Sequence, residues 1–113
     1  MPDPLAVMRG TLDVLVLKAL VWSPMHGLEI SEWLETQAGG NLEVLDSALY
    51  QALYRLESRQ LVTAEWGVTD NSRRARYYKV TRQGRTYLQQ ETARWLRYAD
   101  TVTGILTAPA TPS

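Results

Sequence analysis

The spacing of the apolar residues changes near position 62, and this change most constrains the fold. Before it, apolar side chains recur every three or four positions over 11–22, 28–38 and 47–59, which predicts three amphipathic helices. After it, apolar and polar residues alternate in two short runs, which predicts a β-hairpin. The helical spacing then returns over 82–106. We therefore expect a mainly α-helical fold with a small β-hairpin and a long last helix.

The residues between these segments are those that end and begin helices. The sequence Ser-Pro-Met-His-Gly at 23–27 breaks the first helix, and Gly39 is expected to end the second in a left-handed conformation. Asp46 is the predicted N-cap of the third helix, and Thr81 is that of the last. We interpret His26 as a structural residue at the start of the second helix.

Several aromatic residues are assigned to the core by their spacing. Three of the four tryptophans are expected there: Trp22, Trp33 and Trp66. Tyr78 and Val80 should anchor the second strand of the hairpin to the same core. The segment 67–76 between the strands is too long for a two-residue turn, so we expect its tip to project and to be mobile.

Length and composition indicate one domain with few chemical options. The chain has 113 residues, no cysteine and one histidine, which excludes disulfides and thiolate or histidine-cluster metal sites. We expect no cofactor and no enzyme activity, because no His/Asp/Glu set clusters and no glycine-rich phosphate loop occurs. The longest apolar run is too short to span a bilayer, and residues 1–9 lack the pattern of a signal peptide. The expectation is a soluble, cytoplasmic protein with no membrane partner.

Charge is neutral in total but unevenly distributed. The chain carries 12 basic and 12 acidic residues. Residues 1–54 hold two basic and seven acidic side chains, whereas residues 55–85 hold eight basic and three acidic ones. A local basic cluster can bind a polyanion even in a neutral protein, although a run of arginines can also be a merely solvated face.

The order helix, helix, helix, hairpin, helix is that of a winged helix-turn-helix domain. We assign this domain to 1–81, a dimerisation helix to 82–106 and a disordered tail to 107–113. The third helix then enters the major groove, and the hairpin, or wing, reaches the adjacent backbone or minor groove. Such a domain can also serve protein–protein contact without DNA, but an acidic or apolar wing would then be expected, and this wing is basic.

Five segments, taken in order, resemble the PadR family of winged-helix transcriptional regulators. They are G-T-L-D-V-L-V-L-K-A-L at 10–20, P-M-H-G at 24–27, S-A-L-Y-Q-A-L-Y-R-L-E at 47–57, A-E-W-G-V at 64–68 and R-R-A-R-Y-Y-K-V-T-R-Q-G at 73–84. The likeness covers about residues 8 to 106, and its form is similar to the acidobacterial-type branch. It implies a homodimer that binds a pseudo-palindromic operator, usually as a repressor.

The resemblance also implies which residues contact DNA. The recognition helix falls on Ser47, Tyr50, Gln51, Tyr54 and Arg55, and the wing on Asn71, Arg73, Arg74 and Arg76. Both tyrosines can also be packing residues, and for Tyr54 partial burial and contact with DNA are both open. Arg76 shares the parity of the inward strand residues, which leaves DNA contact and bracing of the wing both open to it.

Two glutamines depart from the family pattern. Gln51 stands where the family usually has proline, and its carboxamide can bond adenine in a bidentate way. Gln60 replaces a frequent glycine after the third helix. It must therefore adopt a positive φ or leave the turn reshaped.

The last helix has a stripe close to a seven-residue repeat, which suits helix–helix packing. The expected dimer interface is Leu88, Thr92, Trp95, Tyr98, Ala99, Val102, Ile105 and Leu106. The rival arrangement folds this helix back on the first helix, where Leu12 and Leu15 could receive it. Some relatives bind small aromatic compounds between subunits, so Trp95 either packs the dimer only or also lines an effector pocket.

Overall fold

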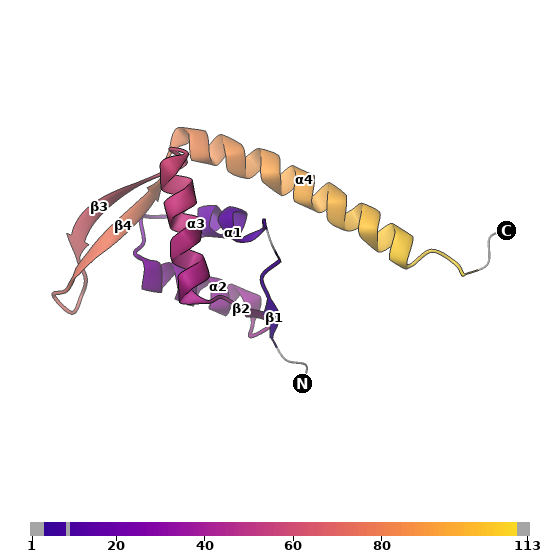
Figure 1. The fold of residues 1–113 in the computed structure, drawn as a ribbon, viewed down its shortest axis with the longest axis horizontal. Coiled ribbons are helices and arrows are strands. Elements are labelled where there is room, and N and C mark those ends of the chain that lie inside the picture. The colour runs from indigo at the N-terminus through magenta and orange to yellow at the C-terminus, as the bar shows by residue number, and fades with distance from the viewer. Residues whose placement is uncertain (1–3, 9, 111–113) are drawn as a thin grey trace.

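The structure is a computed structural model that describes residues 4–8 and 10–110. Within these residues the elements are, in chain order, β1 (Leu5–Ala6), α1 (Leu12–Ala19), α2 (Gly27–Ala38), β2 (Leu42–Glu43), α3 (Asp46–Ser58), β3 (Val62–Val68), β4 (Arg74–Val80) and α4 (Arg82–Leu106). The molecule measures 64 × 35 × 21 Å because α4 extends away from the rest of the chain (Figure 1). The predicted mainly α-helical fold with one hairpin and a long last helix is confirmed.

The core lies where α1, α2 and α3 meet, and the base of the hairpin and the start of α4 close it. Helical spacing places leucine, valine and isoleucine on one face of each helix, and these faces meet. The largest fully buried side chains are Leu17, Leu20, Ile30, Leu49, Leu53, Leu56, Val16 and Val62. The first helix is shorter than predicted, and Leu20 packs into the core from the turn that follows it.

The tryptophans expected in the core differ in their outcomes. Trp33 is half-buried against the core, but Trp22 is 76% exposed and Trp66 is 62% exposed, so the prediction is wrong for those two. Trp22 lies in the turn after α1, where helical periodicity no longer applies. Trp66 shares the strand face of Val62 but lies four residues further along the strand, and the wing projects away from the helices (Figure 1).

Side chains and glycine define the ends of α2. His26 is the N-cap: its Nδ1 accepts a hydrogen bond from the Glu29 N–H (3.4 Å), and the Glu29 carboxylate accepts one from the His26 N–H (3.1 Å). This reciprocal capping box confirms the structural role predicted for His26. Gly39 ends the helix at φ 59°, in the left-handed conformation expected of it.

The N-terminus of α3 differs from the prediction by one residue. Leu45 occupies the cap position in an extended conformation, and no side chain caps the helix there. The assignment of Asp46 as N-cap is therefore wrong. Asp46 is instead the first helical residue, where its carboxylate still interacts favourably with the positive end of the helix dipole.

The wing is a regular antiparallel hairpin in which Val62 pairs with Val80 and Val68 with Arg74. The strands reach further toward the tip than predicted, so the connecting turn is only residues 69–73. Tyr78 and Val80 are buried as expected. Two backbone hydrogen bonds between Tyr78 and Met25 attach the wing to the segment before α2.

The turns on either side of the wing are fixed by backbone conformation and by a cap. Gln60 adopts φ 61°, which is the first of the two alternatives expected where it replaces a glycine. The Thr81 hydroxyl caps α4 by accepting from the Gly84 N–H (2.9 Å), and it donates to the Gln60 carbonyl (2.8 Å). The predicted N-cap is thus confirmed, and it also ties α4 to the end of α3.

The first part of helix α4 packs against the rest of the chain, and the second part projects away from it. Gly84 and Leu88 are its buried residues, and this first part packs against α1, as the fold-back arrangement predicted for it. The second half projects without covering its own chain (Figure 1). Residues 111–113 of the predicted tail, like residues 1–3 and 9, lie outside the described residues. In the described part, no helix is both long and apolar enough to cross a membrane.

Candidate nucleic-acid interface

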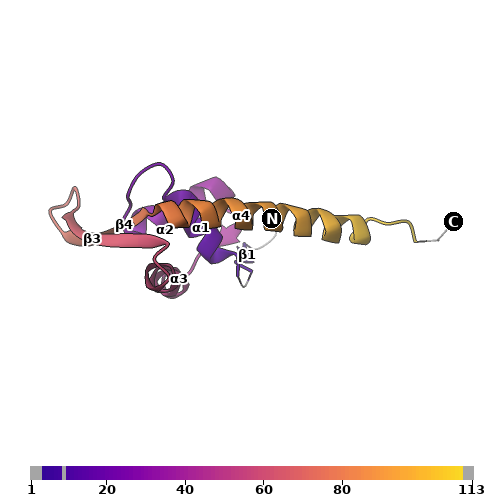
Figure 2. The same cartoon turned by 90° about the horizontal axis from the view of Figure 1, so that it is seen from above.

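Helix α3 stands out on one side of the molecule and presents polar and aromatic side chains there. Figure 2 shows it end-on, displaced from the layer that contains the wing and α4. Its buried stripe faces the core, so the opposite face is exposed: Ser47, Tyr50, Gln51, Tyr54 and Arg55. Tyr54 is 74% exposed, so of the two alternatives left open for it the structure does not support partial burial.

Tyr50 is exposed, and one side of its ring lies against the start of α2. An added Cβ at Gly27 would come within 2.7 Å of the Tyr50 Cζ, so the ring lies directly against the glycine backbone. A side chain at position 27 would force the ring to shift. The glycine that follows His26 therefore makes room for this position of a tyrosine on the exposed side of α3.

One flank of α3 is joined to α1 by an ion pair. The Arg55 Nη2 donates to the Asp13 Oδ1 (2.7 Å), and the Arg55 Nε donates to the Asp13 Oδ2 (3.2 Å). These hydrogen bonds raise the pKa of the Arg55 guanidinium above its ordinary value, with burial opposing the shift. Asp13 therefore occupies two of the N–H donors of Arg55.

The other flank of α3 is joined to the wing by a second ion pair. The Arg76 Nη2 donates to the Glu57 Oε2 (2.8 Å), and the Arg76 guanidinium lies 5.7 Å from the centre of the Tyr78 ring. Of the two roles left open for Arg76, the geometry supports bracing of the wing. Helix α3 is thus joined on both sides by pairs of opposite charge.

The tip of the wing carries the remaining predicted residues. Asn71, Arg73 and Arg74 are exposed, and the turn is closed by a hydrogen bond from the Thr69 N–H to the Arg73 carbonyl (2.8 Å). The Arg74 guanidinium lies 4.6 Å from the centre of the exposed Trp66 indole. Stacking of this kind holds an arginine in an extended, preordered position.

Sequence reasoning missed Asp13, Glu57, Gly27 and the surface role of Trp66. Parity along the strand did indicate that Arg76 faces inward, and so that it needed a partner. No comparable signal linked Asp13 to Arg55, because the two are 42 positions apart in different helices.

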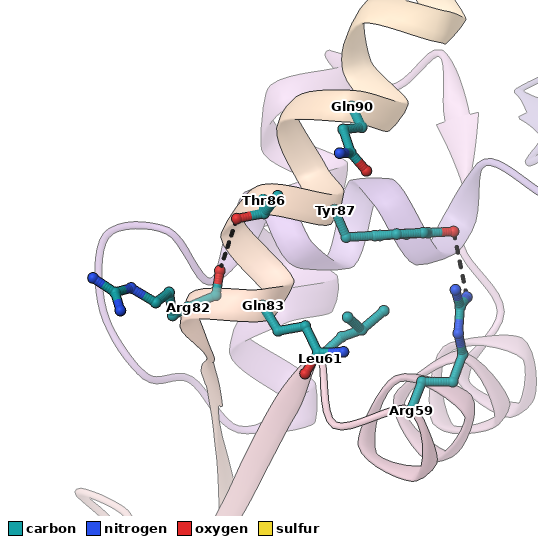
Figure 3. Close-up of a pocket in the computed structure, with 7 residues that line it drawn as sticks. All are labelled: Arg59, Leu61, Arg82, Gln83, Thr86, Tyr87 and Gln90. Carbon is teal, nitrogen blue, oxygen red and sulfur yellow. Dashed lines mark hydrogen bonds between the residues drawn. The ribbon is translucent and has the colours of Figure 1, made fainter.

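A separate open cleft of about 450 Å³ lies between the end of α3 and the start of α4 (Figure 3). Its lining residues are Arg59, Leu61, Arg82, Gln83, Thr86, Tyr87 and Gln90. The Arg59 Nη1 donates to the Tyr87 hydroxyl (3.3 Å), while the Arg82 side chain points away from the cleft (Figure 3). With arginines, carboxamides and no carboxylate in its lining, the cleft suits a neutral or anionic group better than a cation.

The residues expected at a dimer interface fall into two groups. Leu88 is buried in the core of its own chain, whereas Trp95, Tyr98, Ile105 and Leu106 are exposed on the projecting part of α4. The Trp95 and Tyr98 rings lie side by side, with centres 6.2 Å apart. Trp95 does not line the cleft of Figure 3.

Three packed helices, a two-stranded wing and an exposed third helix define the class of winged helix-turn-helix proteins. A model of the transcriptional regulator PadR-like family matches residues 16–90. The chain belongs to this family of transcriptional regulators, and the family predicted from its motifs is confirmed.

Known proteins share both the sequence pattern and the fold. An uncharacterised protein of Lysinibacillus sphaericus is 26% identical over 89 residues, which cover 79% of this chain and 82% of that protein. The crystal structure of a PadR family transcriptional regulator from Eggerthella lenta is 30% identical, with a TM-score of 0.74 over 89% of this chain and 86% of that one. A Streptococcus mutans protein, 24% identical, shares the fold over the full length of both chains with a TM-score of 0.79.

Proposed function

We propose that this protein is a sequence-specific DNA-binding regulator that acts as a homodimeric repressor on a pseudo-palindromic operator. Helix α3 lies in the major groove, and the wing contacts the backbone or the minor groove. The observation that carries the proposal is the arrangement of α3, whose polar face is exposed and whose neighbouring wing presents Arg73 and Arg74. Membership of the PadR-like family supports this reading, and we further propose, from the motifs at 64–68 and 71–75, that the chain belongs to the acidobacterial-type branch.

The geometry of α3 fits the groove that it is proposed to enter. Its 13 residues correspond to a helix about 20 Å long, and a B-DNA major groove admits such a helix. Arg74 belongs to the face of the hairpin that carries Trp66 and Arg76, because alternate residues of a strand share a face. Since Arg76 reaches Glu57 on α3, this is the face that continues the α3 surface.

Dimerisation is proposed to use the projecting part of α4. Trp95, Leu96, Tyr98, Ile105 and Leu106 are large and exposed there, on a helix that otherwise carries many polar residues. A helix with such a surface is normally covered by another element. A second copy related by a two-fold axis covers it symmetrically and places two α3 helices on two half-sites.

The wing supplies the direct test of DNA binding. Arg74→Ala should weaken binding to all DNA sequences and lower the salt dependence by about one unit of log–log slope for each phosphate that the variant no longer neutralises. Lys79→Ala is the matched control, since Lys79 lies on the same strand with its side chain on the opposite face. Equal effects of the two substitutions, or no effect of either on affinity and slope, would count against a DNA-contacting wing.

Selection of bound sequences from random DNA separates this function from a protein–protein contact role. A DNA-binding regulator should enrich a motif with two-fold symmetry, and light scattering should give the mass of two chains at micromolar concentration. A monomer would refute the dimer. Recovery of no motif would favour the alternative of a winged helix that binds another protein. We propose that such a regulator acts in the cytoplasm.

A small aromatic effector near Trp95 remains a proposal with its own test. Trp22, Trp66 and Trp95 are all exposed, so quenching has to be assigned by comparison with Trp95→Phe. An effector at this site should quench the wild-type fluorescence more than that of the variant and should change operator affinity. Without either change, Trp95 serves packing alone.

A further inference from the structure

We propose that Asp13 is a positioning residue that presets Arg55 to read a guanine in the major groove, beside the base pair reached by Gln51. This inference rests on the proposed binding of DNA by α3. It assigns a DNA-recognition role to α1, a helix that does not itself enter the groove.

The hydrogen bonds between the two side chains leave the other N–H donors of the guanidinium available. A guanidinium has five N–H donors, and Asp13 accepts one from Nε (3.2 Å) and one from Nη2 (2.7 Å). The remaining donors are on Nη1 and on the outer side of Nη2. Among the described residues no acceptor contacts them. Two such parallel donors match the O6 and N7 acceptors of guanine.

Asp13 is much less exposed than Arg55, as a positioning role requires. Asp13 is 15% exposed at the side chain, whereas Arg55 is 51% exposed. The carboxylate therefore lies behind the guanidinium, where it is shielded from the phosphates that would repel it. Its backbone belongs to the first turn of α1, beside the buried residues Leu12 and Val16, so the carboxylate is held by the core.

The position of Arg55 on α3 places it beside Gln51. The two residues are one turn apart, so their Cα atoms are about 6 Å apart along the helix axis. Base pairs follow one another at about 3.4 Å, so two such side chains reach base pairs that are adjacent or one step apart. Gln51 and Arg55 also line one shallow cleft of about 300 Å³ together with Ala48 and the segment 6–8.

The ion pair on the opposite flank of α3 shows how a purely bracing pair differs. There the carboxylate of Glu57 belongs to α3 and the arginine belongs to the wing, joined by a single hydrogen bond of 2.8 Å. The Arg76 guanidinium also lies near the Tyr78 ring, and the side chains of Arg76 and Glu57 are almost equally exposed, at 40% and 35%. At Asp13 the arginine belongs to α3 instead, and it is much the more exposed member of the pair.

The alternative to a positioning role is that the Asp13–Arg55 pair is purely structural and only joins the start of α1 to the last turn of α3. Both charges are also favourable to the dipoles of their own helices at these positions. A joining role predicts a loss of stability when either residue is changed. It predicts no change in which base is preferred.

The experiment compares sequences selected from random DNA by the full chain and by three variants. Wild type should enrich a symmetric motif with a guanine in each half-site. Arg55→Lys, which keeps the charge but loses the planar fork, should lower preference for that guanine by about 5- to 150-fold, equivalent to 1–3 kcal/mol. Asp13→Asn should lower it by roughly tenfold although Arg55 is intact, and it should strengthen binding to unrelated DNA, because the released arginine can contact phosphate.

Controls separate the charge, the fold and the proposed function. Glu32→Gln removes one exposed carboxylate from α2 and should leave the base preference unchanged. Urea unfolding of each variant shows whether it is folded at the temperature of selection. A symmetric motif whose bases are the same for wild type, Arg55→Lys and Asp13→Asn would overturn this inference alone. The absence of any motif with wild type would overturn the proposed function itself.

Discussion

A single methyl group at Gly84 should destabilise the protein although it improves the local helix propensity. Gly84 lies in the first turn of α4 and is buried against the start of β3. An added Cβ would collide with the Leu61 carbonyl oxygen and would come within 2.9 Å of the Val80 Cγ2. The collision with Leu61 is with backbone, which cannot move aside by rotating a side chain.

The magnitude follows from two opposing effects. Replacing glycine by alanine within a helix ordinarily stabilises it by up to about 1 kcal/mol. Overpacking of a buried site costs typically 1–3 kcal/mol, and here the Leu61 carbonyl also accepts hydrogen bonds from the Thr81 N–H (3.1 Å) and hydroxyl (3.1 Å). We expect Gly84→Ala to lower the free energy of unfolding by about 1–2 kcal/mol net. It should also tilt α4 and so weaken operator binding.

Gly104 provides the matched control, because it lies in the same helix and a Cβ added there would meet none of the described atoms within 4 Å. Gly104→Ala should raise the free energy of unfolding by up to about 1 kcal/mol. The assay is urea unfolding of the three proteins at one fixed protein concentration, followed by far-UV circular dichroism. A Gly84→Ala protein as stable as wild type, or more stable, would refute the reasoning about the Leu61 contact.

Three further predictions concern residues at the base of the wing, and the same unfolding assay tests them. Thr81→Val should cost about 1 kcal/mol, because it removes the cap hydrogen bond to the Gly84 N–H; an unchanged midpoint would contradict the cap. Gln60→Gly should raise stability by up to about 1 kcal/mol by relieving a left-handed non-glycine residue, and a loss would mean that the side chain contributes more than its backbone costs. Burial raises the pKa of Tyr78, with Arg76 opposing the shift, so the folded state keeps the proton that the unfolded chain begins to lose near pH 10. Stability should therefore be intact below about pH 10 and fall above it. Tyr78→Phe should remove that part of the fall, and identical profiles would refute the shift.

Local patterns were sufficient to predict most of the fold. The change of apolar spacing located the hairpin, and the residues His26 and Thr81 marked helix starts because capping depends on residues only three positions apart. Gly39 and Gln60 were informative because a positive φ is a property of one residue. Each of these signals is contained within a few neighbouring positions.

Features that depend on the extent of the fold were not predictable in the same way. Periodicity placed Trp66 on the correct face of its strand, but it could not show that the helices covering that face end before Trp66. The Asp46 cap was wrong by one residue because an extended Leu45 occupies the position instead. The pairing of Asp13 with Arg55 depends on how α1 and α3 pack against each other. Local patterns in a single sequence do not predict that packing geometry.

Under the proposed dimer, the projecting half of α4 connects the stability of each chain to the concentration of the protein. A surface that only a second copy covers contributes to folding in proportion to the concentration of that copy, so dilution alone lowers the apparent free energy of unfolding. Chains that open more often are cleaved more often by proteases. Under the proposed dimer, scarce protein would be removed quickly and abundant protein would persist. Through the exposed part of α4, the rate of degradation would depend on protein concentration. Small changes in the rate of synthesis would then cause larger changes in the amount of protein retained.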